Sequence, residues 1–155
     1  MYNTLLCMLT LTELFSSTTS ESYIKKLANT YADRLAVCHE VAHKAEALGI
    51  KPRIAIAIAY EESRFEVDRV SSAGAIGPMQ VLPKYLECLT KPCDSVRDGL
   101  LILQRWMKHF PKTYLCHYNA GWRCNRASRR YARRIELRAL KLYQQLSKVT
   151  YDYTD

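Results

Sequence analysis

Residues 52–65, PRIAIAIAYEESRF, decide the fold of this chain. The IAIAIA core alternates in side-chain size, and strict alternation can indicate a strand. Three features favour a buried helix instead: Ala is a good helix former, Pro52 suits the start of a helix, and the segment runs directly into EESRF. We therefore predict a helix over residues 53–65 that carries two adjacent carboxylates, Glu61 and Glu62.

The rest of the sequence also favours helices. Five Gly and five Pro in 155 residues are few, and this scarcity of helix breakers favours long helices over many short strands. Further helices are expected over residues 20–48, 83–89, 94–110 and 114–118, and from residue 128 onward. Residues 65–77 lack helical spacing and contain two Gly. The sequence predicts an all-α domain of five or six helices with one long structured loop.

The N-terminal segment is apolar but ambiguous. We expect a segment or helix over residues 1–20, one domain over residues 21–150 and a tail over residues 151–155. No basic residue precedes the apolar run Leu5–Leu11, and Glu13 follows it closely. The run is therefore a poor signal peptide and too short for a transmembrane helix. An amphipathic helix packed on the domain is the preferred interpretation.

Net charge and cysteine content indicate which partners and which redox compartment suit the chain. The net charge is +8, from 23 Lys and Arg against 15 Asp and Glu, which suits nucleic acid, an anionic membrane face or an anionic cell-wall polymer. Two local pairs of the six Cys, Cys88 with Cys93 and Cys116 with Cys124, would suit disulfides in an oxidising compartment. Buried thiols remain the alternative for each pair.

A dense motif follows the IAIAIA segment. Its elements are Glu62-Ser63-Arg64-Phe65, Ser71, Gly74-Ala75-Ile76-Gly77-Pro78-Met79-Gln80, Pro83, Tyr118-Asn119-Ala120-Gly121 and Tyr131-Ala132-Arg133-Arg134-Ile135. In this order they resemble the signature of the soluble lytic transglycosylases (SLT-type), a family similar to lysozymes, including the goose type. Two positions depart from that signature: Arg69 stands where the family usually has Ala, and Pro78 where it usually has Leu.

The resemblance implies an activity and a set of site residues. It implies an α-rich lysozyme-like fold, in which the long loop borders a catalytic cleft, and a peptidoglycan lytic transglycosylase. Such an enzyme cleaves the β-1,4 bond between MurNAc and GlcNAc and forms 1,6-anhydro-MurNAc, without a metal or cofactor. Glu62 would be the catalytic acid and base. The substrate-binding residues that the resemblance implies are Ser71, Met79, Gln80, Tyr118, Asn119 and Tyr131. A peptidoglycan hydrolase, such as a lysozyme or endolysin, is the alternative on the same fold.

The resemblance also implies a partner and a location. The partner would be the glycan strands of peptidoglycan, with no nucleic acid, no stable membrane insertion and a monomeric enzyme. The site of action would be the periplasm or the cell wall. Because the signal peptide is poor, a phage lysis or virion enzyme and a bacterial enzyme exported by another route both stay open.

The chemistry of Glu62 can be argued without the family. On a helix, Glu62 lies above Ile58 and Ala59 and close to Phe65. An apolar surrounding should raise the pKa of the carboxyl group, as a general acid near neutral pH requires. Glu61 has similar neighbours, so helical phase does not separate the two residues. Only the alignment with E-S-x-F selects Glu62.

Other motifs in the sequence allow two alternative functions, a zinc metalloprotease and a nucleic-acid-binding protein. His39-Glu40-Val41-Ala42-His43 spells the zinc motif H-E-x-x-H, and Glu61 or Glu62 follows at a spacing that suits a third ligand of a metalloprotease. A solvated helix face is the alternative explanation of these residues.

The basic helix near the C-terminus could bind nucleic-acid phosphates, but a solvated or wall-binding face is the simpler explanation. Its basic residues are Arg129, Arg130, Arg133, Arg134, Arg138 and Lys141. Trp122 could stack on a sugar ring.

Overall fold

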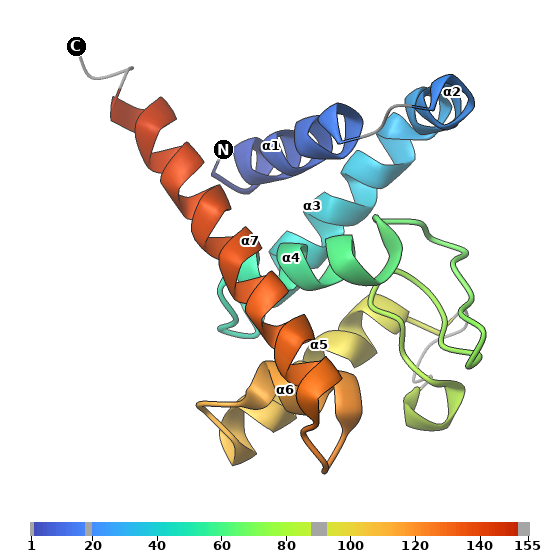
Figure 1. Ribbon diagram of the computed structural model, residues 1–155, viewed down its shortest axis with the longest axis vertical. Helices are drawn as coiled ribbons and strands as arrows, with labels where there is room; N and C mark the ends of the chain where they lie inside the picture. The colour runs from blue at the N-terminus through green and yellow to red at the C-terminus, as the bar shows by residue number, and fades with distance from the viewer. Residues whose placement is uncertain (1, 18–19, 88–92, 152–155) are drawn as a thin grey trace.

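The computed structural model describes residues 2–17, 20–87 and 93–151. Within them it has seven α-helices, one 3-10 helix and isolated β-bridges only (Figure 1). The helices are α1 (Tyr2–Ser16), α2 (Glu21–Asn29), α3 (Tyr31–Ala47), α4 (Pro52–Ser63), α5 (Ser95–His109), α6 (Tyr114–Ala120) and α7 (Arg126–Tyr151), and the 3-10 helix is η1 (Pro83–Tyr85). The prediction of an all-α fold is confirmed, although the helices outnumber the five or six expected.

One extra helix arises from a break at Thr30. The sequence predicts a continuous helix over residues 20–48, whereas α2 ends at Asn29 and α3 begins at Tyr31. The Thr30 hydroxyl donates to the carbonyl oxygens of Lys26 and Leu27, at 3.0 and 3.3 Å. Such side-chain bonds compete with regular helical bonding. They accompany the break at Thr30, which the apolar spacing of residues 20–48 does not indicate.

Helix α4 forms the centre of the core. It packs against α1, α3 and α7, and Ala55 through Ala59 are fully buried. Because helices surround α4, both the Ile and the Ala positions of the alternating segment are covered. Burial of Ile56 or Ile58 contributes about 1.5–3 kcal/mol each by the usual transfer scale. The alternation that could indicate a strand therefore marks a helix buried on most sides.

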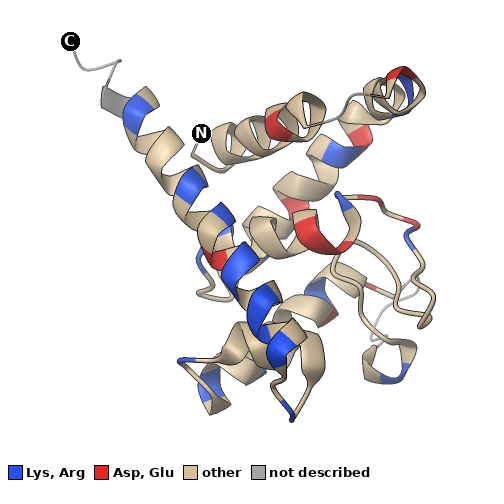
Figure 2. Cartoon of the chain, in the orientation of Figure 1, with Lys and Arg blue, Asp and Glu red and all other residues tan. Residues whose placement is uncertain are grey.

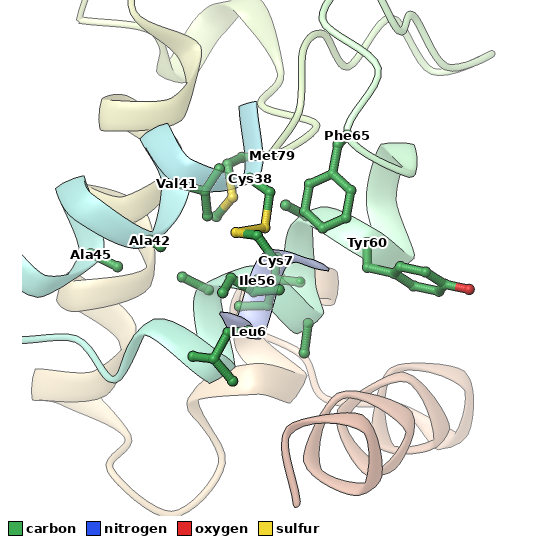
Figure 3. Close-up of a cluster of buried hydrophobic side chains, with 14 of the residues drawn as sticks. Leu6, Cys7, Cys38, Val41, Ala42, Ala45, Ile56, Tyr60, Phe65 and Met79 are labelled. Carbon is green, nitrogen blue, oxygen red and sulfur yellow. A yellow bond between two sulfur atoms is a disulfide. The ribbon is translucent and has the colours of Figure 1, made fainter. Parts of the chain in front are cut away.

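Helix α1 is an integral part of this core. Leu6, Leu11 and Leu14 are buried, and α1 packs on α3, α4 and α7. A disulfide joins Cys7 to Cys38 on α3, with the two Cα atoms 5.7 Å apart (Figure 3). This bond was not expected from the local spacing of cysteines. In the described part of the chain, no helix is long and apolar enough to cross a membrane.

Local caps and a second disulfide define the other end of the molecule. Asp94 caps α5 at the start of the helix expected over residues 94–110, because its Oδ1 atom accepts a hydrogen bond from the Arg97 backbone N–H at 2.9 Å. Cys116 on α6 bonds to Cys124, as expected for that local pair, and so closes the turn before α7. Cys88 lies outside the described residues, as does the end of the short helix expected over residues 83–89, of which the structure shows η1.

Candidate active site

The Glu62 carboxyl lies at a partly buried point on the wall of a cleft. Burial raises the pKa of Glu62 above its usual value, and the charge of neighbouring Glu61 adds to this effect. Tyr131 on α7 donates a hydrogen bond from its hydroxyl to Oε1 of Glu62 at 2.6 Å, which pulls the pKa in the opposite direction. Burial dominates. The result is a carboxyl that stays protonated at a higher pH than an exposed one and is held by a fixed donor.

Glu61 has a different environment from its neighbour. Its carboxylate forms an ion pair with Arg134 on α7, and its side chain is 18% exposed. Glu61 is also absent from the residues that line the cleft. Arg134 and Tyr131, three residues apart on α7, thus hold the two carboxylates in separate positions, a distinction that helical phase alone does not make.

The cleft has a volume of about 650 Å³ and is walled by three segments of the chain. The loop between α4 and α5 forms one side, and α5 and α6 with the following turn form the other. Its lining residues are Glu62, Ser71, Ala73, Ala75, Gln80, Val81, Leu82, Tyr85, Ile102, Arg105, Trp106, His109, His117, Tyr118, Asn119, Ala120, Gly121 and Trp122. Glu62 is the one Asp or Glu in this lining, so the described cleft offers a single carboxyl for proton transfer.

Ser63 ties the loop to the helix that carries Glu62. Its hydroxyl is within hydrogen-bond distance of the carbonyl oxygens of Ala59, at 3.1 Å, and Pro78, at 2.9 Å. The same oxygen accepts a bond from the Phe65 backbone N–H at 3.0 Å. The Ser of the E-S-x-F motif therefore stabilises the junction between α4 and the loop. Pro78 departs from the family pattern in its side chain, but its backbone carbonyl oxygen still lies within hydrogen-bond distance of the Ser63 hydroxyl.

Arg34 was missed by sequence reasoning, although it holds the start of the loop. Its side chain is almost fully buried and donates to the carbonyl oxygen of Arg64 and to Oε1 of Glu66, the latter at 2.8 Å. Arg34 lowers the pKa of Glu66 by this bond against the effect of partial burial. A cation at helical spacing from Val37, Cys38 and Val41 was the signal that could have identified it.

Ser71 and Gln80 lie in the cleft as the motif predicts. The Ser71 Oγ atom accepts from the Ala75 N–H at 3.0 Å, which leaves its own hydroxyl hydrogen free to donate. Gln80 donates from Nε2 to the carbonyl oxygens of Gly77 and Arg69, at 2.9 and 3.1 Å. Arg69, the second position that departs from the family signature, thus contributes to the loop through its backbone carbonyl oxygen, which binds Gln80.

Met79 departs from the expected role of a substrate-binding side chain. It is fully buried and does not line the cleft. Its side chain packs on α5, where a Cβ added to Gly99 would come within 2.5 Å of the Met79 Cβ. The Met79 carbonyl oxygen accepts a hydrogen bond from the Tyr118 hydroxyl at 2.8 Å. Met79 therefore positions Tyr118 and the loop instead of presenting its side chain to a ligand.

Tyr118 and Asn119 reach the cleft from α6. The helix runs to Ala120, two residues beyond the expected end, so the Y-N-A part of the motif is helical and only its Gly121 lies in the following turn. Both Tyr118 and Asn119 line the cleft, and Asn119 is exposed there. Their positions relative to Glu62 are therefore fixed by packing of α6 on α5 and α7.

The H-E-x-x-H segment lies on α3, away from this cleft. Glu40 accepts from Lys44 Nζ at 2.6 Å, and Lys44 also donates to Asp94. His39 and His43 meet no third ligand, because the described residues contain no group of three His, Cys, Asp or Glu side chains able to hold a metal ion. The geometry therefore gives the zinc hypothesis no support.

Basic residues follow one another along α7 (Figure 2), and they differ in whether they pair with an acidic side chain. Arg134 pairs with Glu61, while Arg138 and Lys141 both pair with Glu13 of α1. These cations attach α7 to the rest of the fold. The other arginines of the predicted basic helix, Arg129, Arg130 and Arg133, are exposed near the start of α7. The basic helix is therefore not one continuous surface of unpaired cations.

Comparison with known proteins agrees with this arrangement. The transglycosylase SLT domain model matches residues 39–140. Among solved structures, an inactive mutant of the lytic transglycosylase Slt from Pseudomonas aeruginosa superposes with a TM-score of 0.58 at 20% identity. That match covers 69% of this chain and 24% of that chain, so this chain spans about a quarter of the length of its structural relative. No curated protein matches. The family model covers most of the chain, including the Glu62 helix, the loop and α6, and the chain therefore belongs to the transglycosylase SLT domain family.

Proposed function

We propose that the chain is a peptidoglycan lytic transglycosylase that cleaves the β-1,4 bond between MurNAc and GlcNAc and leaves 1,6-anhydro-MurNAc. The observation that carries the proposal is the single carboxyl in the described cleft. Glycosidases that use two carboxylates place both beside the scissile bond, and Glu62 has no such partner among the lining residues. A mechanism with one carboxyl fits this geometry better than one with two. The site would act in the periplasm or at the cell wall, on glycan strands.

In the proposed mechanism Glu62 transfers a proton twice. Protonated Glu62 first donates to the glycosidic oxygen, so that the bond from MurNAc C1 breaks and GlcNAc leaves. The acetamido group of the substrate supports the positive charge at C1. The C6 hydroxyl of the same MurNAc then attacks C1, and Glu62 takes the hydroxyl proton. No water is consumed, and Glu62 ends protonated. The raised pKa of Glu62 favours the first step.

The products of peptidoglycan digestion test this proposal directly. Purified peptidoglycan is incubated with the enzyme, and the released muropeptides are weighed by mass spectrometry. Muropeptides lighter by one water than their reducing counterparts are the expected result. Reducing ends would instead identify a hydrolase on the same fold. Intact glycan would reject both activities.

Tyr131→Phe should shift the pH profile of the same reaction. Loss of the hydroxyl removes the hydrogen bond that lowers the pKa of Glu62, so this pKa should rise further. Because activity requires protonated Glu62, the alkaline limb of the rate profile should move to higher pH. The rate at the optimum should fall about tenfold, since the bond also orients the carboxyl. The measurement is muropeptide release across a pH series.

Tyr143→Phe is the matched control for that prediction. Tyr143 is an exposed residue of the same helix, and its ring contacts Arg53, a contact that Phe retains. Its pH profile should coincide with that of the parent. An alkaline limb that moves to lower pH in Tyr131→Phe would contradict the role assigned to the hydroxyl.

A further inference from the structure

Beyond the motif residues, the cleft contains one cation and a rigid aromatic group. Arg105 is the one Lys or Arg among the residues that line the cleft. It is exposed on α5, and it forms no salt bridge within the described part of the chain, in contrast to Arg134 and Arg138 of α7. A guanidinium group that faces a cleft and has no carboxylate partner in the described part of the chain is available to a carboxylate of a ligand.

The aromatic group beside Arg105 is a stack built on His117. The His117 ring stacks on Phe110, with ring centroids 3.9 Å apart, and on Trp106, at 5.4 Å, and the Trp106 and Phe110 rings lie 5.9 Å from each other. Its Nδ1 atom bonds to the Gly121 carbonyl oxygen at 2.8 Å, which fixes the turn that carries Trp122. Since Trp106 is the neighbour of Arg105 on α5, the cation and the stack share one wall of the cleft.

Trp122 extends this stack into the open cleft. Its ring meets Trp106 edge-on at 5.1 Å and Phe110 at 6.0 Å, yet the residue is 73% exposed. The Cys116–Cys124 disulfide closes the turn in which it stands. A large apolar ring that is both exposed and fixed in place can receive a ligand without ordering first. A sugar ring has an apolar face of suitable size.

We propose that Arg105 and Trp122 form a subsite that binds a muramyl residue by its ring and by a carboxylate that it carries. The inference rests on the proposed function, because it names which part of the glycan strand this wall of the cleft recognises. Trp122 would stack on the apolar face of a sugar ring in any N-acetylated strand. Arg105 would bind a carboxylate, either the lactyl carboxylate of a strand without peptides or a carboxylate of the peptide stem.

Three ligands separate these contributions. Chitohexaose has N-acetylated sugars and no carboxylate, a glycan strand stripped of peptides has lactyl carboxylates only, and an intact strand carries stem peptides. Dissociation constants are measured in the Glu62→Gln background, which prevents cleavage. The added variants are Arg105→Gln, Trp122→Ala and, as control, Lys108→Gln. Lys108 is exposed on the same helix but lies outside the cleft.

Arg105→Gln should weaken binding of a carboxylate-bearing strand about tenfold, as loss of one charge-assisted bond predicts, and leave chitohexaose binding unchanged. A loss for the stripped strand alone identifies the lactyl carboxylate, which is an amide in the intact strand, and a loss for the intact strand alone identifies the stem. A loss for both strands means that Arg105 accepts either carboxylate. Trp122→Ala should weaken all three ligands, and Lys108→Gln none. A loss in Arg105→Gln that is equal for all ligands, or no loss, would overturn the subsite.

The product assay separates failure of the subsite from failure of the proposed function. If the parent releases anhydro-muropeptides while Arg105→Gln binds the carboxylate-bearing strands as tightly as the Glu62→Gln background does, the subsite alone is rejected. If the parent binds no glycan and releases no product, the proposed function is rejected and the subsite with it. Thermal unfolding of Arg105→Gln is expected to match the parent, because the side chain is exposed.

Discussion

Glu62→Gln is expected to lower the rate of anhydro-muropeptide release about a thousandfold, within the range of general acid–base catalysis. The amide has nearly the shape of the carboxyl group and can still accept the bond from Tyr131. It cannot give a proton to the glycosidic oxygen or take one from the C6 hydroxyl. Since one carboxyl performs both transfers in the proposed mechanism, its loss affects both steps. Initial rates on purified peptidoglycan measure the effect.

Glu61→Gln is the matched control, one residue away on the same helix. Its carboxylate pairs with Arg134, which is more than half exposed, and such pairs contribute little to stability. This variant should keep a rate within about threefold of the parent, as expected for a surface ion pair. If Glu61→Gln abolished activity while Glu62→Gln kept it, the assignment of the acid would be wrong.

Stability separates a chemical effect of Glu62→Gln from a folding defect. Burial makes the charged form of Glu62 unfavourable, and an amide carries no charge to desolvate. The variant should therefore unfold at a temperature equal to or above that of the parent. A functional carboxyl in an apolar surrounding is expected to lower the stability of the fold in this way.

Much of the site could be predicted because the motif contains many of the residues that line the cleft around Glu62. Glu62, Ser71, Gln80, Tyr118 and Asn119 all line one cleft, as their order in the motif indicates. The difference between Glu61 and Glu62 could not be predicted from helical phase, since it depends on distant segments. Tyr131 and Arg134, about 70 positions downstream, determine how the adjacent carboxylates differ.

Met79 and Thr30 show where sequence patterns are insufficient. An apolar residue within a binding motif can face the ligand or the core, and only the absence of a side chain at Gly99 lets Met79 enter the core. Thr30 lies at a break between two helices, where its side chain bonds to the carbonyl oxygens of Lys26 and Leu27, and no apolar periodicity indicates this break. In both cases a single local contact overrides a pattern spread over many residues.

The Cys7–Cys38 disulfide is a third feature that spacing did not reveal, and it yields the largest expected effect on stability. The bond spans 31 positions, and closing a loop of that size stabilises a fold by about 3–4 kcal/mol through the entropy of the unfolded chain. Cys7→Ala with Cys38→Ala should lower the free energy of unfolding by at least that amount. The midpoint of thermal unfolding should fall by about 8–15 °C for a chain of this size. Calorimetry and denaturant titration measure both quantities.

Met8→Ala on the same helix is the control for this variant. Met8 is 47% exposed, so its truncation should change the stability by no more than about 0.5 kcal/mol. The parent in reductant should lose at least as much stability as the double variant, because reductant also opens Cys116–Cys124. No residue of α1 lines the cleft, so well below its unfolding midpoint the double variant should cleave glycan at the parent rate. Equal stability of the double variant and the parent would mean that the bond does not constrain the chain. A lost activity with retained folding would mean that α1 supports the cleft as well as the core.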